Sequence, residues 1–571
     1  MSGESPHRHH IKLAASRRFP HRRVMKSRHA TTRAGVLATV TLACIGFAAT
    51  ACAATPAPEA STDVKTMPQS PSGSEPVESL TWNMGSGEPA TLNPPNVPTY
   101  SGMALVSNLC DSLLSVDEQG AIIPGLATVE METPTRAVFA LRGEPTFWDG
   151  TPLTSEDIVF SMNLAASPAS YLAPTYASVA SITALSPTEV AVDFSAPDAG
   201  FLPTMAGVGG AIMQRAFTEA AGENVGTPSV GLMCSGPFEL GRWNPGTDIT
   251  ITKNENYWDA ERAPLVESVR MTFITDTSAM TQAFATGEVD GGWEIPSTAV
   301  PALTNTEVGA LYFGDTTSVW SLRVADPSSV LANEPKLREA FQHLVDRDAI
   351  ASVVFSGAAQ PWATAISPNS WPAAESEQAL ETYSTIAGDR SYDPEKAGDL
   401  VEEAGATGEK LEVIVASGDE TASKIAQLLQ EQAKSVGLDL SINSLQPLEY
   451  AQAMYDPAAR AGSDLLLGVS GDVIQEPLTS IRYYYLPDGL YNWDGFADDD
   501  LSTLFEEAIT TADPAERVER TLEIQSVYEA HGGTIAIVNP YQVNFVNDRI
   551  GGVITSWVYT NLPSLAFVGG R

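Results

Sequence analysis

The stretch from Cys234 to Trp258 reads CSGPFELGRWNPGTDITITKNENYW and lies near the middle of the 571-residue chain. Ser235-Gly236-Pro237 predicts a bend, and Asn244-Pro245-Gly246 predicts a hairpin turn between two runs that alternate in polarity. Turn residues and alternation alone are typical of an ordinary hairpin in a sheet. The segment therefore predicts two paired strands and by itself says nothing of function.

Three further stretches carry distinctive patterns. They are DSLL followed by PGLA at residues 111–127, FWDGTPLTSEDIVFS at 147–161 and TQAFATGEVD at 281–290. Together with the Ser-Gly-Pro-Phe bend and the Lys-Asn-x-Asn-Tyr-Trp end of the central stretch, they resemble one family. It comprises the extracytoplasmic solute-binding proteins of ABC importers, family 5, which take up oligopeptides, dipeptides and, in some members, nickel. The resemblance covers residues 79–571 in the family's order of motifs.

This resemblance implies a two-lobed α/β fold of the periplasmic-binding-protein type (type II, cluster C) with a hinge. The expected scaffold domain takes residues 77–115, 232–312 and 534–571, an extra small domain II takes 116–231, and an α/β domain III takes 313–533. Alternating helix and strand patterns from about residue 316 independently predict a layered α/β domain. A domain made of three separated segments implies two crossing strands, which form a natural hinge.

Local signals place several helices. Apolar spacing predicts a helix over residues 105–114. Thr154 and Asp157 have the spacing of a capping box, as do Asp513 and Glu516, so a helix is expected to begin at each pair.

The first 76 residues are not expected to belong to the fold. Residues 1–51 combine a basic segment with an uncharged apolar run, the pattern of an export signal, although a membrane-spanning anchor is the alternative. Ala49-Thr50-Ala51-Cys52 resembles a lipoprotein processing box with Ala49 where leucine is usual, so Cys52 is the expected lipidation site. Residues 52–76 predict a flexible tether. Met25 is an alternative start, and Arg17-Arg18-Phe19 leaves twin-arginine export open beside the general route.

The chain is strongly acidic, with 32 basic and 70 acidic residues and a net charge of −38. Nine of the basic residues precede Cys52, so the remainder is more acidic still. Such a charge excludes nucleic acid and anionic lipid surfaces as partners of the folded part. Solubility explains the charge, and steering of cationic ligands is the sharper alternative.

Two cysteines remain beyond the tether, Cys110 and Cys234. The resemblance assigns both to the scaffold domain, and exported proteins meet oxidising conditions, so a disulfide between them is expected. Two buried free thiols are the alternative.

No catalytic pattern stands out. Only His343 and His531 follow the export segment, both in or next to predicted helices, and no nucleophile elbow, zinc-protease motif, Cys-x-x-Cys or phosphate-binding glycine loop occurs. The chain is therefore not expected to be an enzyme or to hold a cofactor or metal. A secreted hydrolase that uses paired carboxylates is the alternative from another class.

The expected binding residues come from the resemblance. Asp472, in Ser-Gly-Asp-Val-Ile-Gln-Glu-Pro after a predicted strand, corresponds to the aspartate with which peptide-binding members hold the ligand's ammonium group, although one extra residue and Val473 alter the loop. A turn cap is the alternative role. Trp493, Trp320 and Arg323 are further candidates to line the pocket, and Asn93 lies in a loop that the family places at the cleft.

The sequence therefore predicts a monomeric, lipid-anchored protein on the extracytoplasmic face of the membrane. It captures a short peptide by hinge closure and delivers it to the permease and ATPase subunits of an ABC importer. A binder of a nickel chelate or another non-peptide solute, and a receptor that signals to a membrane partner, are the other hypotheses for this fold.

Overall fold

The computed structural model describes residues 64–372, 376–472, 474–511 and 513–571. Within it, the central stretch forms the hairpin that its turn residues predict: β8 (Phe238–Asn244) and β9 (Asp248–Lys253) pair antiparallel. Gly246 has a φ of +73°, a left-handed conformation that glycine adopts without steric cost, so the chain reverses at this point.

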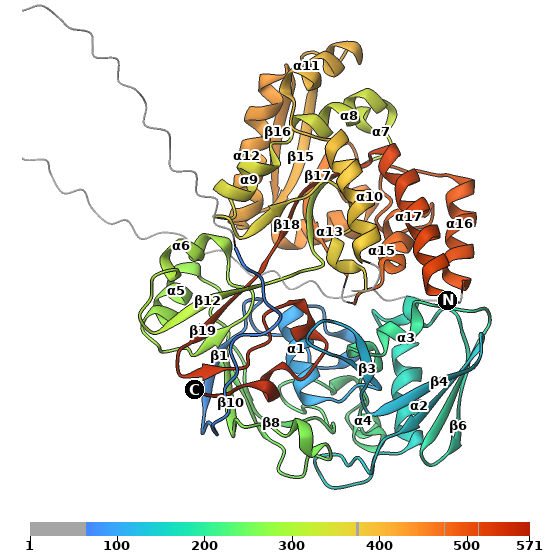
Figure 1. Cartoon of the computed structure of the whole chain (residues 1–571), viewed down its shortest axis with the longest axis vertical. Helices are drawn as coiled ribbons and strands as arrows, with labels where there is room; N and C mark the ends of the chain where they lie inside the picture. The colour runs from blue at the N-terminus through green and yellow to red at the C-terminus, as the bar shows by residue number, and fades with distance from the viewer. Residues whose placement is uncertain (1–63, 373–375, 473, 512) are drawn as a thin grey trace, which may run out of the picture. The chain divides into compact units, whose positions relative to one another are not determined.

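This hairpin forms one edge of a seven-stranded mixed sheet in the order β12-β19-β11-β1-β10-β9-β8 (Figure 1). The other strands are β1 (Leu80–Asn83), β10 (Ser268–Thr272), β11 (Gly291–Gly292), β12 (Gly309–Gly314) and β19 (Gln542–Asn547). Three helices belong to the same region: α1 (Tyr100–Leu109), α5 (Thr277–Ala285) and α6 (Val300–Leu303). Two small ladders, β2 (Leu114–Val116) with β3 (Ile122–Pro124) and β20 (Ile550–Gly551) with β21 (Gly569–Gly570), accompany them.

The expected helix over residues 105–114 is wrong in its bounds, because α1 runs from Tyr100 to Leu109. The side chain of Thr99 accepts a hydrogen bond from the N–H of Gly102 and caps the helix, so it begins five residues earlier. Leu114 instead begins the strand β2.

A four-stranded antiparallel sheet in the order β4-β5-β7-β6 forms the small domain. Its strands are β4 (Ala127–Thr133), β5 (Arg136–Leu141), β7 (Glu189–Phe194) and β6 (Val179–Ser186), with helices α2 (Ser155–Ala165), α3 (Phe201–Thr204) and α4 (Arg215–Ala221). The capping box predicted before α2 is confirmed, because the N–H of Thr154 donates to Asp157 at 3.0 Å.

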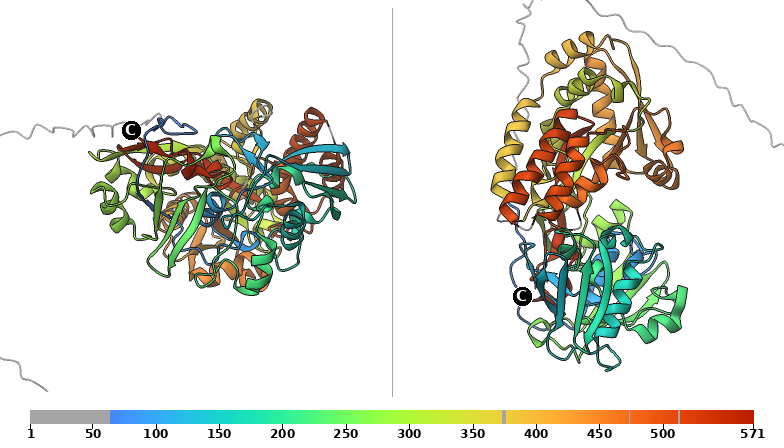
Figure 2. Two further views of the ribbon diagram at one scale, coloured as in Figure 1. Left: turned by 90° about the horizontal axis from the view of Figure 1, so that it is seen from below. Right: turned by 90° about the vertical axis from the view of Figure 1, so that its right-hand side faces the viewer.

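The third region is a six-stranded sheet in the order β14-β18-β13-β17-β15-β16, flanked by helices (Figure 1). Its strands are β14 (Ala359–Pro361), β18 (Thr534–Pro540), β13 (Val319–Val324), β17 (Leu465–Ser470), β15 (Lys410–Ala416) and β16 (Asp439–Leu445). Its first helices are α7 (Val330–Asn333), α8 (Pro335–Leu344), α9 (Arg347–Val353), α10 (Ser376–Asp389), α11 (Pro394–Glu403) and α12 (Glu420–Ser435). The remaining ones are α13 (Pro447–Tyr455), α14 (Pro457–Arg460), α15 (Pro477–Tyr484), α16 (Asp499–Thr510) and α17 (Pro514–His531), of which α16 and α17 run side by side in Figure 2.

Residues 66–75 correct one expected boundary. The expected tether, 52–76, pairs with the scaffold in this part through bridges from Thr66 to Phe313, from Gln69 to Ile554 and from Glu75 to Gly570.

The strand β18 corrects a second expected boundary. Residues 534–571 were all expected to belong to the scaffold. This is wrong for β18, because it is hydrogen-bonded to β13 and β14 in the six-stranded sheet. The chain returns to the seven-stranded sheet only at Gln542, where β19 begins.

Two short connections join the two large sheets. Residues 315–318 lead from β12 to β13, and Tyr541 alone leads from β18 back to β19. The apolar cores follow this division: Leu80 and Phe139 belong to one cluster shared by the scaffold and the small domain, whereas Leu322 and Ile537 belong to another. Elsewhere, the N–H of Ala199 donates to the carbonyl of Ile509 at 3.1 Å and links the small domain to α16.

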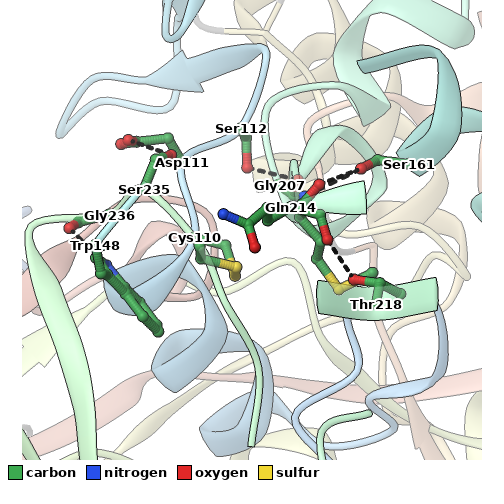
Figure 3. Close-up of a disulfide and its surroundings, with 12 residues drawn as sticks. Cys110, Asp111, Ser112, Trp148, Ser161, Gly207, Gln214, Thr218, Ser235 and Gly236 are labelled. Atoms are coloured by element: carbon green, nitrogen blue, oxygen red, sulfur yellow. Dashed lines mark hydrogen bonds between the residues drawn. A yellow bond between two sulfur atoms is a disulfide. The ribbon is translucent and has the colours of Figure 1, made fainter. Parts of the chain in front are cut away.

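The central stretch is attached to α1 by a disulfide and by hydrogen bonds (Figure 3). Cys110 and Cys234, the expected pair, form a disulfide with their Cα atoms 4.9 Å apart. The neighbouring Asp111 accepts a hydrogen bond from the hydroxyl of Ser235 at 3.0 Å. Among the helices of the described ranges, none combines the length and apolar character required to cross a bilayer.

Candidate ligand-binding cleft

A cleft of about 430 Å³ lies where the two connections meet the two large sheets. Its walls come from three sources: the scaffold, the connections and the six-stranded region. Its lining residues include Gly85, Ser86, Tyr100, Glu294, Thr316, Ser318, Trp320, Phe355, Asp419, Val469, Tyr541 and Gln542. A smaller recess of about 30 Å³ shares Tyr100, Thr316, Ser318 and Gln542 with it and adds Asp472 and Tyr559.

Asp472 lies in the smaller recess, two residues beyond the end of β17. Its carbonyl oxygen accepts a hydrogen bond from the hydroxyl of Thr317. Its carboxylate accepts one from the hydroxyl of Ser480 at 2.5 Å. The residue is only 7% exposed. Burial raises the pKa of Asp472 to about 7, against the opposing effect of neighbouring serine hydroxyls. A buried carboxylate of this kind gains stability when a cationic group of a ligand pairs with it.

Glu294 is a second carboxylate of the cleft, and it comes from the scaffold. Its carboxylate accepts hydrogen bonds from the hydroxyl of Ser86, at 2.9 and 2.8 Å, and from that of Ser101. Desolvation raises the pKa of Glu294 as well. Its backbone has a φ of +58°, which is uncommon for a residue other than glycine and costs on the order of 1 kcal/mol or more.

Tyr100, the first residue of α1, lines the cleft together with Glu294 and the recess together with Asp472. It keeps 38% of its surface exposed, so part of the ring is accessible from the cleft. Desolvation raises the pKa of Tyr100 to about 12, and the ionised forms of Tyr484, Glu294 and Asp472 raise it in the same direction. The phenol therefore stays protonated at neutral pH and can donate a hydrogen bond to a ligand.

The wall opposite the scaffold is largely apolar. Trp320 on β13 and Phe355 pack edge to face with their ring centroids 6.4 Å apart, and Val469 on β17 leaves 48% of its surface exposed. Such a surface can take up an apolar side chain or the main chain of a ligand. Among the described residues that line the cleft and the recess, none is a lysine, arginine or histidine.

The expected binding residues are thus only partly brought together. Asp472 and Trp320 line the site. Arg323 and Trp493 do not line it: Trp493 packs in a separate apolar cluster, and the Arg323 guanidinium lies 4.2 Å from the centre of the Tyr484 ring and 5.6 Å from that of Trp493. Their aromatic and cationic groups stabilise one another inside the domain.

Asn93 also lies apart from the lining residues. Its side-chain amide donates to Asn96 at 3.3 Å, and its main-chain N–H donates to the hydroxyl of Thr91. The loop that carries it is held elsewhere by Glu88, which accepts a hydrogen bond from the indole of Trp243 at 2.7 Å. The loop reaches the cleft through its first part, at Gly85 and Ser86.

Sequence reasoning missed Glu294, Tyr100, Gln542 and Tyr559. Glu294 follows Trp293 in a segment with no motif, and its positive φ has no signature in the sequence. Tyr559 comes from the C-terminal segment, far along the chain from the other lining residues. The expected lipidation site, Cys52, lies outside the described residues.

No group of three or more His, Cys, Asp or Glu side chains in the described ranges is placed to hold a metal ion. The site is therefore a cleft with polar and apolar walls and two acidic groups, the buried Asp472 and the half-buried Glu294. Such a cleft, set at the crossing between two α/β regions, is the architecture of a solute-binding protein.

Comparison with known proteins identifies the family. Residues 121–492 match the bacterial extracellular solute-binding proteins, family 5 Middle. The chain belongs to this family, so its function as a solute-binding protein of ABC import systems, expected from the sequence motifs, is confirmed at the family level.

Individual relatives are more distant. The chain is 25% identical over 445 residues to the glutathione-binding protein GsiB of Escherichia coli, covering 75% of this chain and 82% of GsiB. It resembles the periplasmic binding protein DppA of Helicobacter pylori in complex with the peptide STSA, with a TM-score of 0.72, 19% identity and coverage of 87% and 98%. It also resembles NikA of Staphylococcus aureus in complex with Ni(L-His)2, with a TM-score of 0.68, 17% identity and coverage of 85% and 98%. These structures confirm the expected periplasmic-binding-protein fold.

Proposed function

We propose that this protein captures short peptides in the cleft and delivers them to the permease of an ABC importer. The observation that carries the proposal is the buried Asp472 carboxylate at the end of β17, which opens into a recess beside the cleft. A peptide's terminal ammonium group would pair with this carboxylate, and Tyr100 and Gln542 would add hydrogen bonds.

Hinge closure is the proposed mechanism. Both connections between the large sheets contribute lining residues, among them Thr316, Ser318 and Tyr541. A ligand that contacts both sides stabilises the closed arrangement. To change the population from 1:99 to 99:1, it must favour that arrangement by about 5.5 kcal/mol, which several hydrogen bonds and one charge-assisted bond supply.

The proposal includes a lipid anchor, a monomeric state and the membrane subunits of the importer. Lipidation of Cys52 would anchor the protein at the extracytoplasmic face of the membrane, and a monomer would present its closed form to the permease while the ATPase subunits drive release. We propose no catalytic role, because Glu294 and Asp472 accept hydrogen bonds from serines and, among the described residues that line the site, no histidine faces them.

Glutathione is a second candidate, because the relatives at 25% identity are glutathione-binding proteins. It is itself a short peptide, but it carries two carboxylates. The described lining residues provide no basic side chain to pair with them. We therefore expect glutathione to bind more weakly than a peptide without acidic side chains.

Native mass spectrometry of protein purified without denaturation tests the proposal, followed by release and sequencing of the bound molecules. A set of short peptides that share length but not sequence is the expected result. A single non-peptide mass, such as a nickel chelate, would overturn the peptide assignment and leave the fold unaffected. Asp472→Asn is expected to weaken binding of released peptides at least tenfold.

A further inference from the structure

We propose that Glu294 forms a second cation-binding point in the cleft, so that the preferred ligand carries two positively charged groups, one at Asp472 and the other at Glu294. This inference rests on the proposed function and narrows it to ligands with a basic side chain or a second amine. Glu294 belongs to the scaffold and Asp472 to the six-stranded region, so such a ligand would bridge the two sides of the cleft.

The hydrogen bonding of Glu294 supports this role. Both of its carboxylate oxygens accept bonds from serine hydroxyls, and no ion pair of Glu294 occurs among the residues that the structure describes. Neutral hydroxyls orient a carboxylate but leave its charge uncompensated. A carboxylate that two serines hold in place, in a desolvated position, is arranged to receive a cation.

The electrostatic environment favours the same conclusion. Asp419 is a third acidic residue on the cleft wall, and the described lining residues include no basic side chain. The negative charges of Glu294 and Asp472 both raise the pKa of Tyr100, so the two carboxylates act on the same small space. A dication relieves both charges, whereas a ligand with one ammonium and one carboxylate leaves Glu294 unpaired.

An unpartnered phenol provides an independent indication of a ligand. Tyr559 is only 1% exposed, and its hydroxyl has no hydrogen-bond partner among the described residues. Its ring stacks on Trp293, with centroids 4.9 Å apart, and this contact fixes its direction. Tyr559 lines the recess that contains Asp472, and the charge of Glu294 contributes to the raised pKa of Tyr559. A buried hydroxyl is costly without a partner, and the ligand ammonium group that pairs with Asp472 in the same recess would supply one.

The conformation of Glu294 also fits a binding role. Gly85 approaches it so closely that a Cβ atom at position 85 would lie 2.7 Å from the Cβ of Glu294. The strained backbone of residue 294 is therefore held by its surroundings, and it directs the side chain toward Ser86 and Ser101.

Isothermal titration calorimetry with matched tripeptides tests the proposal on the full protein. The series is tri-alanine with lysine, norleucine or glutamate at each position in turn, because norleucine has nearly the shape of lysine without its charge. At one position we expect lysine to bind at least tenfold more tightly than norleucine, and glutamate to bind most weakly. This comparison uses the wild-type chain, so it does not depend on the folding of a variant.

The variant Glu294→Gln tests whether the preference for lysine over norleucine depends on Glu294. Glutamine keeps the size and the backbone constraint, so we expect this variant to bind lysine and norleucine peptides within about twofold of each other. The control is Glu403→Gln, which removes an acid that pairs with Lys336 on the surface and should leave the lysine preference unchanged. Melting temperatures of both variants verify folding.

Three results overturn the inference. They are equal binding of lysine and norleucine peptides at every position, a lysine preference that survives Glu294→Gln, and a loss that is equal for all peptides in that variant. The first leaves the proposed peptide function intact. If no peptide binds while 1,5-diaminopentane does, and Glu294→Gln abolishes that binding, the peptide function is wrong and the second cation-binding point is supported. If neither class binds, both proposals are wrong.

Discussion

The indole N–H of Trp258 donates a hydrogen bond to the half-buried carboxylate of Asp111 at 2.9 Å. The hydroxyls of Tyr257 and Ser235 donate to the same carboxylate, at 2.8 and 3.0 Å. One acidic side chain next to Cys110 therefore binds both ends of the central stretch. This explains why its terminal residues matter to the fold as much as its hairpin does.

We expect Asp111→Asn to lower the free energy of unfolding by about 1–3 kcal/mol, because asparagine offers one acceptor oxygen to three donors. Tyr257→Phe removes a single donor and leaves the other two bonds in place, so its loss should be smaller. Urea denaturation of both variants measures the difference. Equal stability of Asp111→Asn and wild type would show that the three bonds contribute nothing net.

The disulfide between Cys110 and Cys234 closes a sequence separation of 124 residues. In the chain-entropy model, such a closure stabilises the folded state by roughly 4–5 kcal/mol. The double variant Cys110→Ala/Cys234→Ala should lose stability of this order, and reducing agent should lower the melting temperature of the wild type but not of the variant. A variant that melts like oxidised wild type would contradict this expectation.

Peptide affinity should depend on pH through Asp472. Burial raises the pKa of Asp472 to about 7, and the titratable groups that act on it from neighbouring elements, Tyr100, Tyr383 and Tyr484, have raised pKa values and stay neutral near that pH. A ligand ammonium group binds the ionised carboxylate. Affinity should therefore rise about fivefold from pH 6 to pH 7.5, with proton release on binding near pH 7, and should level off at higher pH because the peptide's own α-amino group, with a pKa of about 8, loses its charge.

Calorimetry in buffers of different ionisation enthalpy measures this proton release. Asp472→Asn provides the control, because it cannot ionise, and its weaker binding should change little over the same pH range. An unchanged pH dependence in that variant would assign the titration to another group.

The buried ion pair of Arg390 and Glu529 should matter far more than a surface pair. Their atoms lie 2.5 Å apart, Glu529 is 4% exposed, and its carboxylate also accepts the N–H of Ala365. Glu529→Gln leaves a buried guanidinium without its counter-ion and should cost about 3–5 kcal/mol. Glu403→Gln breaks the exposed pair with Lys336 and should cost less than about 1 kcal/mol. Chemical denaturation compares the two, and similar losses would contradict the argument.

Much of the fold could be predicted from local chemistry. Asn244-Pro245-Gly246 closes the β8–β9 hairpin, and the Thr154 capping box sets the start of α2, because both depend only on neighbouring residues. The start of α1 could not be predicted in the same way. Its first turn contains Ser101 and Gly102, which break the apolar pattern, and the cap at Thr99 determines where the helix begins.

The site was less predictable than the fold. Asp472 follows a strand in a recognisable motif, whereas Glu294 is positioned by a positive φ that its neighbours impose. Arg323 and Trp493 have the residue types of a binding site but stabilise each other in the interior. Tyr559 reaches the recess from the C-terminal segment, and only the three-dimensional path of the chain brings it there.

The two connections between the sheets have a mechanical consequence. One contains four residues and the other a single residue, Tyr541. Two connections this short restrict sliding of one sheet region along the other, so we expect rotation about the line through the two connections to be the main relative motion. Thr316, Ser318 and Tyr541 lie on these connections and also line the cleft, so a bound ligand contacts the axis of that rotation. We therefore expect a change in ligand size to alter the relative rotation of the two regions, and with it the contact between Ala199 and Ile509.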